Sequence, residues 1–132
     1  MKKLLFISLL FTSTLALAQD QKISTIDFVQ ILNDNREEAI FYYENNWLEL
    51  RKMAIERGYV YSYEIMETKP TEEATFHLIL KTTYPNQNAF DQAEQRFQEL
   101  IKEKGELQLL NDKKPGEFRK VLFSKADARH LY

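Results

Sequence analysis

The side chains best suited to chemistry in this chain are grouped around one histidine. His77 lies in the run 75–84, where apolar and polar residues alternate as they do in a strand. This alternation directs Thr75, His77 and Lys81 to one face. An imidazole there can act as a general base or as an axial haem ligand. We favour the plainer alternative, a histidine hydrogen-bonded within a polar interface, because a residue without a surrounding motif is a weak signal.

A second group of polar side chains lies on the two segments that precede this run. Arg51 adjoins the apolar stripe of a predicted helix, and its guanidinium fork can bind a carboxylate at an interface. We favour for Arg51 the plainer alternative, a solvated position with an ion pair of small value. Tyr61 and Tyr63 share one face of the run 59–67, and they line the same cavity as His77 if that face points inward. The candidate ligand-binding residues are therefore His77, Lys81, Thr75, Tyr61, Tyr63 and Arg51.

The composition excludes several kinds of chemistry, and we assign no catalytic or metal-binding residue. The chain has no cysteine, which excludes thiol catalysis, thiolate metal sites and iron–sulfur clusters. Its three glycines stand apart from one another, so no glycine-rich loop is present to hold a phosphate. The other histidine, His130, lies near the C-terminus, where we expect a frayed chain. Two histidines so placed do not form a recognisable metal site.

The first eighteen residues predict a cleavable export signal. Lys2 and Lys3 precede an apolar run that is too short for a membrane span of about 20 residues, and residues 16–18 provide the small-x-small cleavage pattern. Residues 19–132 then form a single α+β domain without membrane insertion, in the periplasm or secreted. This part has 16 basic and 20 acidic residues, a net charge of −4, which argues against nucleic acid as a partner.

The periodicity of the mature part predicts alternating strands and helices. A capping-box pattern of Asn35 and Glu38 precedes the first helix, in which Trp47 belongs to the apolar stripe. In the run 75–84, Phe76, Leu78 and Leu80 are expected to face the helices. The expected elements are strands at 23–32, 59–67, 75–84 and 118–124, helices at 37–57 and from Asn86 or Asn88 to 104, a turn at 115–116, and a short strand or covering loop at 107–110.

The order β-α-β-β-α-β is that of a ferredoxin-like fold, an antiparallel sheet with two helices on one face. Such an arrangement leaves the other face of the sheet uncovered. An exported domain without disulfides depends on its apolar core or on oligomerisation for stability. We therefore expect a homodimer.

The layout of residues 23–124 resembles the dimeric α/β-barrel superfamily. The stretches 42–47, 80–84 and 94–97, together with Arg51, Ala54 and residues 58–59, are also similar to small exported bacterial proteins without an assigned function. This resemblance implies a fold and a dimer but no particular chemistry. Haem monooxygenases of the superfamily use an asparagine, a tryptophan and a histidine. This chain has Asn46, Trp47 and His77, but Trp47 falls on a predicted helix rather than a strand, so that role is not transferred.

The expected function is the binding of a small, partly apolar ligand between the two sheets of a homodimer. One alternative is a protein-interaction or structural module that docks through the wide apolar face of the first helix. The other is an enzyme, either a haem-binding protein or a cofactor-independent oxygenase, with His77 near the reactive centre. No cofactor can be named from the sequence, and enzymatic activity is the less favoured alternative.

Overall fold

The computed structural model describes residues 21–132, so the predicted export signal over residues 1–18 lies outside the described part of the chain. The protein has the predicted α+β composition. In chain order the elements are β1 (Ile23–Ile31), α1 (Arg36–Tyr42), the π-helix η1 (Tyr43–Trp47), α2 (Leu48–Glu56), β2 (Ser62–Glu67), β3 (Leu78–Tyr84), α3 (Gln87–Asp91), α4 (Ala93–Lys104), α5 (Pro115–Phe118) and β4 (Arg119–Arg129).

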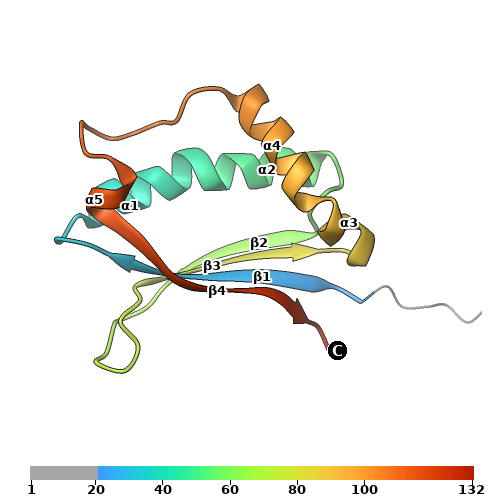
Figure 1. Cartoon of the computed structure of the whole chain (residues 1–132), viewed down its shortest axis with the longest axis horizontal. Coiled ribbons are helices and arrows are strands. Elements are labelled where there is room, and N and C mark those ends of the chain that lie inside the picture. Colours follow the sequence, from blue (N-terminus) through green and yellow to red (C-terminus); the bar gives the residue numbers. More distant parts are fainter. Residues whose placement is uncertain (1–20) are drawn as a thin grey trace, which may run out of the picture.

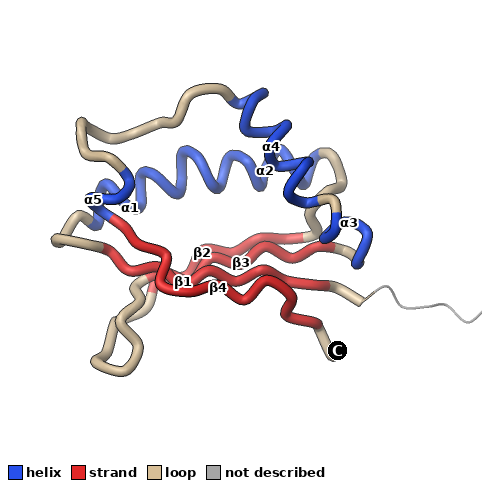
Figure 2. The backbone as a smooth tube through the Cα atoms, in the orientation of Figure 1, coloured by secondary structure: helices blue, strands red, loops and turns tan. Residues whose placement is uncertain are grey.

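The four strands form one antiparallel sheet in the order β2-β3-β1-β4. The described helices all lie on the same side of this sheet, with the continuous α1-η1-α2 helix running across it and α4 packed beyond (Figure 1). Figure 2 shows the same division into a helical layer and a sheet layer. One face of the sheet is thus covered and the other carries no helix.

Side chains that alternate toward the helices form the core. Val29 and Leu78, which are opposite each other in the β1–β3 ladder, are 0 % exposed and pack with Leu80 and Tyr43. A second buried cluster, which includes Ala54 of α2 and Leu100 of α4, joins these two helices to the end of β3. The apolar stripe of the first helix therefore faces its own sheet, as the helical periodicity predicts.

The uncovered face of the sheet carries an aromatic cluster. The ring of Phe28 stacks on Phe123 at 4.5 Å between centroids and meets Phe76 edge-on at 4.9 Å. The prediction that Phe76 faces the helices is therefore wrong, because regular strand structure begins only at Leu78 and residues 74–77 do not follow its alternation. Phe123 remains 48 % exposed in the monomer.

Several predicted boundaries differ from those in the structure. The first helix contains a π-helical segment, and the second is interrupted at Gln92. The turn predicted at 115–116 begins the short helix α5, and β4 continues to Arg129. Residues 107–110 form a loop, which agrees with the second of the two predicted alternatives.

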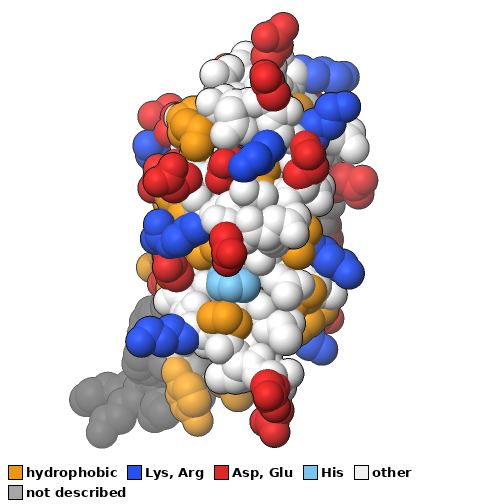
Figure 3. Space-filling view, turned by 90° about the vertical axis from the view of Figure 1, so that its left-hand side faces the viewer, with side chains coloured by type: hydrophobic (Ala, Val, Ile, Leu, Met, Phe, Trp, Pro, Cys, Tyr) orange, Lys and Arg blue, Asp and Glu red, His pale blue; other side chains and the backbone are white. Residues whose placement is uncertain are grey.

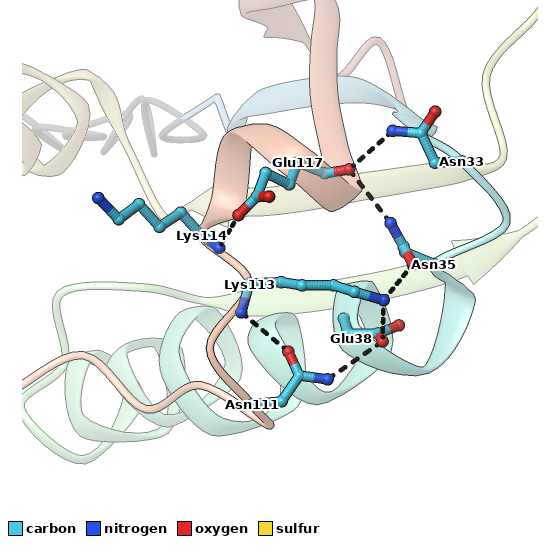
Figure 4. Close-up of polar contacts among 7 residues, drawn as sticks. All are labelled: Asn33, Asn35, Glu38, Asn111, Lys113, Lys114 and Glu117. Atoms are coloured by element: carbon cyan, nitrogen blue, oxygen red, sulfur yellow. Dashed lines mark hydrogen bonds and ion pairs between the residues drawn. The ribbon is translucent and has the colours of Figure 1, made fainter.

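A polar network fixes the start of the first helix to the segment before β4 (Figure 4). The side chain of Asn35 makes no capping bond, contrary to the predicted capping box. Its Nδ2 donates instead to the carbonyl of Glu117 at 3.2 Å. Lys113 Nζ donates to Asn35 Oδ1 at 2.7 Å and to Glu38 Oε1 at 2.9 Å. Because it lies so close, Lys113 lowers the pKa of Glu38 below its usual range.

Candidate functional site

The first helix and α4 enclose a cavity of about 300 Å³, which we call the Arg51 cavity. It opens between η1–α2 on one side and the end of α4 with the following loop on the other. Its walls are mostly apolar and aromatic, with three polar side chains among them and no acidic residue. The lining residues are Tyr42, Tyr43, Asn46, Trp47, Leu50, Arg51, Ile101, Lys104, Gly105 and Leu107.

The π-helical segment places the polar residues of this wall. Asn45 and Asn46 donate from Nδ2 to the carbonyls of Phe41 and Tyr42 at 2.8 Å each. These are the carbonyls that an α-helix would pair with the backbone N–H groups of the same two asparagines. In the π-helical segment the side-chain amides of both asparagines bind these carbonyls. Such π-helical segments occur often at functional sites.

Asn46 also fixes the loop that borders the cavity. It is 5 % exposed, and its amide forms a reciprocal pair with the backbone of Gln108, with both hydrogen bonds at 2.8 Å. Lys104 Nζ donates to the same Asn46 Oδ1 at 3.2 Å. The four hydrogen bonds of Asn46 thus connect the first helix, the end of α4 and the loop around one side of the cavity.

Arg51 is one of two charged groups that line the cavity, beside Lys104, and no acid in the described chain forms an ion pair with Arg51. Its guanidinium carbon lies 4.2 Å from the ring centroid of Trp47 and 4.4 Å from that of Phe97. Its one hydrogen bond within residues 21–132 runs from Nε to Thr82 Oγ1 at 3.1 Å. Burial lowers the pKa of Arg51 to about 10, and the charges of Tyr84 and Asp27 offset only part of this effect. Arg51 therefore keeps its charge at neutral pH without a counter-ion in the described part of the chain.

Trp47 provides a second donor without an acceptor. The indole Nε1 is buried and has no hydrogen-bond partner among residues 21–132. Buried donors in folded proteins are nearly always paired, so an unpaired one calls for an explanation. Trp47 is also the only tryptophan of the chain, which makes it a specific spectroscopic reporter of this site.

A second cavity, of about 410 Å³, lies on the other side of η1, above β2. Tyr43 lines both cavities, and burial raises the pKa of its hydroxyl. The basic group of the second cavity, Arg36, is neutralised by Glu67, with Nη2 and Oε2 2.6 Å apart. Acidic and basic side chains alternate over the adjacent end of the molecule (Figure 3). The second cavity therefore has no unpaired buried charge comparable to Arg51.

The six candidate residues from the sequence do not converge on one site. Arg51 lines the cavity named after it, and Tyr63 lines the second cavity, with its ring 6.2 Å from that of Trp47. Lys81 pairs with Glu64 at 3.4 Å. The other three residues lie apart from these cavities. His77 lies beside the end of β1, and Thr75 is exposed in the loop before β3. Tyr61 is exposed before β2, and Lys22 Nζ lies 3.8 Å from the centroid of the Tyr61 ring.

His77 completes the edge of the β1–β3 ladder. Its backbone N–H donates to the carbonyl of Val29, and its Nδ1 accepts a hydrogen bond from the backbone N–H of Ile31 at 3.0 Å. The ring thus takes the place of a carbonyl acceptor where regular pairing ends. An accepting Nδ1 requires the neutral tautomer that carries its proton on Nε2.

His130 is held in the sheet, so the frayed end predicted for it is wrong. Its Nε2 lies 2.6 Å from Ser24 Oγ, which also lies 2.7 Å from Thr83 Oγ1. A serine next to a histidine is the arrangement of a nucleophile and its base. However, Ser24 is only 2 % exposed and its hydroxyl already contacts Thr83. The three side chains therefore connect the C-terminal segment to β1 and β3.

Sequence reasoning missed Asn46 as a functional candidate, although a signal was present. Two adjacent asparagines in the middle of a predicted helix are unfavourable for an α-helix.

Comparison of the chain with protein-family models, with curated proteins and with solved structures gives no match. Within residues 21–132 no group of three or more metal-ligating side chains is placed to hold an ion. No helix in this range is long and apolar enough to cross a membrane.

Proposed function

We propose that this chain is a binding protein for a small, partly apolar molecule, and that the Arg51 cavity receives it. The observation that carries the proposal is a cavity of about 300 Å³ with mostly apolar walls and the terminal N–H donors of Arg51, which have no acceptor in the described chain. Small-molecule sites are concave, largely apolar and contain a few convergent polar groups. The apolar walls would supply most of the affinity, and the donors would orient the ligand.

The hydrogen bonds of Asn46 support this function because they hold the cavity open before a ligand arrives. Asn46 fixes the loop at Gln108 on one side and Lys104 on the other. A site that is formed in advance avoids the cost of ordering its loops on binding. The π-helical segment that directs Asn46 inward would then be a feature of the binding site.

Filling the cavity from its rim tests the proposal. Ile101 lines the cavity and is 51 % exposed, so Ile101→Trp adds volume at the opening without removing core contacts. The control is Ile55→Trp, since Ile55 is similarly exposed at 40 % but lies outside the cavity. We expect native mass spectrometry of the mature protein to detect a small ligand with the wild type and with Ile55→Trp, and to lose it with Ile101→Trp. Equal retention by all three proteins would contradict the proposal.

We also propose that the fold is ferredoxin-like and that the uncovered sheet face pairs with a second copy of the chain. The strand order β2-β3-β1-β4, with the helices on one face, supports the fold. The exposed Phe123 and its stacked partner Phe28 support the interface, because such aromatic clusters are typical of interface cores. A ligand between two such sheets is the second candidate function.

The interface is tested by placing a charge at its centre. Light scattering of the mature protein should give the mass of a dimer, and Phe123→Glu should give a monomer. Leu131→Glu, at a position 81 % exposed beyond the end of β4, is the control and should remain dimeric. A wild-type monomer at high micromolar concentration would contradict the interface and leave the Arg51 cavity as the only site proposed.

Export to the periplasm or the outside remains part of the proposal and rests on the N-terminal sequence pattern. The enzymatic alternative receives no comparable support. His77, on which that alternative depends, accepts a backbone hydrogen bond from Ile31 at its Nδ1. We therefore do not extend the proposal to haem binding or oxygenase chemistry.

A further inference from the structure

We infer that the Arg51 cavity selects a small monocarboxylic acid with an apolar body, and that Arg51 binds the carboxylate. This inference deepens the proposed function and depends on it, because it names the chemical class of the ligand. It starts from the charge balance of the cavity. The lining includes Arg51 and Lys104 but no aspartate or glutamate.

Arg51 is a largely but not fully buried cation, and it has no counter-ion within residues 21–132. Charged side chains that leave water are normally paired, because an unpaired charge loses its hydration without compensation. No carboxylate lies within ion-pair distance of Arg51 in residues 21–132. Asp27 lies near enough to raise the pKa of Arg51 but forms no ion pair with it, and its carboxylate accepts a hydrogen bond from Ser124 Oγ at 2.5 Å. A ligand carboxylate would supply the missing negative charge.

The geometry of the guanidinium leaves its outer edge for the ligand. Nε is used by Thr82, and the faces of the group lie near the rings of Trp47 and Phe97. The terminal nitrogens have no hydrogen-bond partner among the described residues, while the side chain lines the cavity. A planar fork held by two ring contacts and a hydrogen bond is suited to the bidentate binding of a carboxylate.

The remaining walls indicate what the rest of the ligand resembles. Leu50, Ile101 and Leu107, together with the aromatic rings, offer an apolar surface. A cavity of about 150 Å³ holds benzene, so one of about 300 Å³ has room for roughly a dozen non-hydrogen atoms. Lys104 Nζ, the other cation of the lining, donates to Asn46 Oδ1. The fork of Arg51 in such surroundings fits one carboxylate on an aryl or alkyl body better than a multiply charged phosphate, which is usually held by several backbone N–H groups.

Three probes of nearly equal size and different charge test this inference. They are 3-phenylpropionate, its neutral amide 3-phenylpropanamide and the cation 3-phenylpropylamine. Binding to the mature protein is followed by calorimetry and by the indole N–H resonance of Trp47, the only tryptophan. We expect the acid to bind at least about tenfold more tightly than the amide, since hydrogen bonds to charged groups are the stronger ones. The amine should bind most weakly.

Variants connect this preference to Arg51. In Arg51→Gln the acid should bind no better than the amide, and Arg51→Lys, which keeps the charge and loses the fork, should retain part of the preference. The control is Arg57→Gln, because Arg57 pairs with Glu103 outside the cavity. This variant should bind the acid and the amide with the affinities of the wild type. Persistence of the full acid preference in Arg51→Gln would overturn the inference.

The outcomes separate the inference from the proposed function. Equal binding of acid and amide by the wild type would refute the carboxylate assignment and leave the cavity as a binding site. If no probe binds and the Trp47 resonance stays unchanged, both the cavity proposal and the inference fail.

Discussion

Replacement of Arg51 by methionine tests whether this arginine serves binding or stability. Methionine fills a similar volume beside Trp47 and Phe97 but has no charge. A structural arginine that pairs with a buried acid costs about 3–5 kcal/mol when its partnership is broken. Arg51 has no such acid in the described chain, so its removal should have a much smaller effect.

The size of the expected change in the free energy of unfolding follows from the environment of the Arg51 guanidinium. Burial lowers its pKa from the ordinary value of arginine to about 10. Because a tenfold change in proton affinity is about 1.4 kcal/mol, the charge costs roughly 3 kcal/mol at neutral pH. Against this stand two contacts with aromatic rings, each about 1 kcal/mol, and the hydrogen bond to Thr82, also about 1 kcal/mol. These terms nearly cancel, and Arg51→Met should change the free energy of unfolding by less than about 1 kcal/mol.

Urea denaturation of the mature protein at pH 7 measures this change, with Arg57→Met as the control on the same helix. The pH dependence gives an independent check. Above pH 10 the unfolded state holds more protons at Arg51 than the folded state, so Arg51 contributes a gain in stability as the pH rises. Burial of Tyr43 and Tyr84 acts in the opposite direction in both proteins, so this gain is measured as the difference between the wild type and Arg51→Met. Arg51→Met should lack that gain. A loss of 3 kcal/mol or more at pH 7 would refute the reasoning and show that Arg51 is a structural residue.

Three further predictions concern Asn46 in the cavity wall, the pair of Glu38 and Lys113, and the turn at Asp34. Asn46→Ala removes four hydrogen bonds. It should therefore lower the free energy of unfolding by about 2–4 kcal/mol and accelerate hydrogen exchange of the Gln108 amide. Unchanged exchange would contradict the role given to Asn46. The pKa of Glu38 is lowered by Lys113, so the stability from this pair should be present above pH 4.5 and be lost as the pH falls through the lowered pKa. Lys113→Met should therefore lose less stability than the wild type as the pH falls through that range. Identical acid-denaturation profiles of the two proteins would argue against the pair. Asp34 has a φ of 55°, a left-handed conformation that glycine adopts without strain. Asp34→Gly should therefore raise the free energy of unfolding by about 0.5 kcal/mol, and the thermal midpoint slightly with it. A lower midpoint would show that the aspartate side chain stabilises the turn.

The sequence predicted the class of fold because periodicity is a local property. Alternation over 78–84 and the 3.6-residue period over 37–57 depend only on which side chains are apolar. The misplacement of Phe76 shows the limit of this approach. Its neighbours continue the alternating pattern in sequence, but the ladder ends at Leu78, so Phe76 packs with Phe28 and Phe123 on the opposite face.

The cavity could be predicted only in part. From the sequence we favoured a solvated position for Arg51, and a carboxylate anchor at an interface was the other possibility. The packing of α4 against α2 places Phe97 next to Arg51 and produces a cavity within one chain. The π-helical segment was not predictable from periodicity, since it depends on which carbonyls the side chains of Asn45 and Asn46 bind.

The most direct measurement for the central claim is a titration of the mature protein with 3-phenylpropionate, followed through the indole N–H resonance of Trp47. Because this indole lies in the wall of the Arg51 cavity and its N–H has no partner in the described chain, its resonance should shift saturably, and Ile101→Trp should weaken the response. A Trp47 resonance that stays in place up to millimolar concentrations of the acid, the amide and the amine would contradict the account.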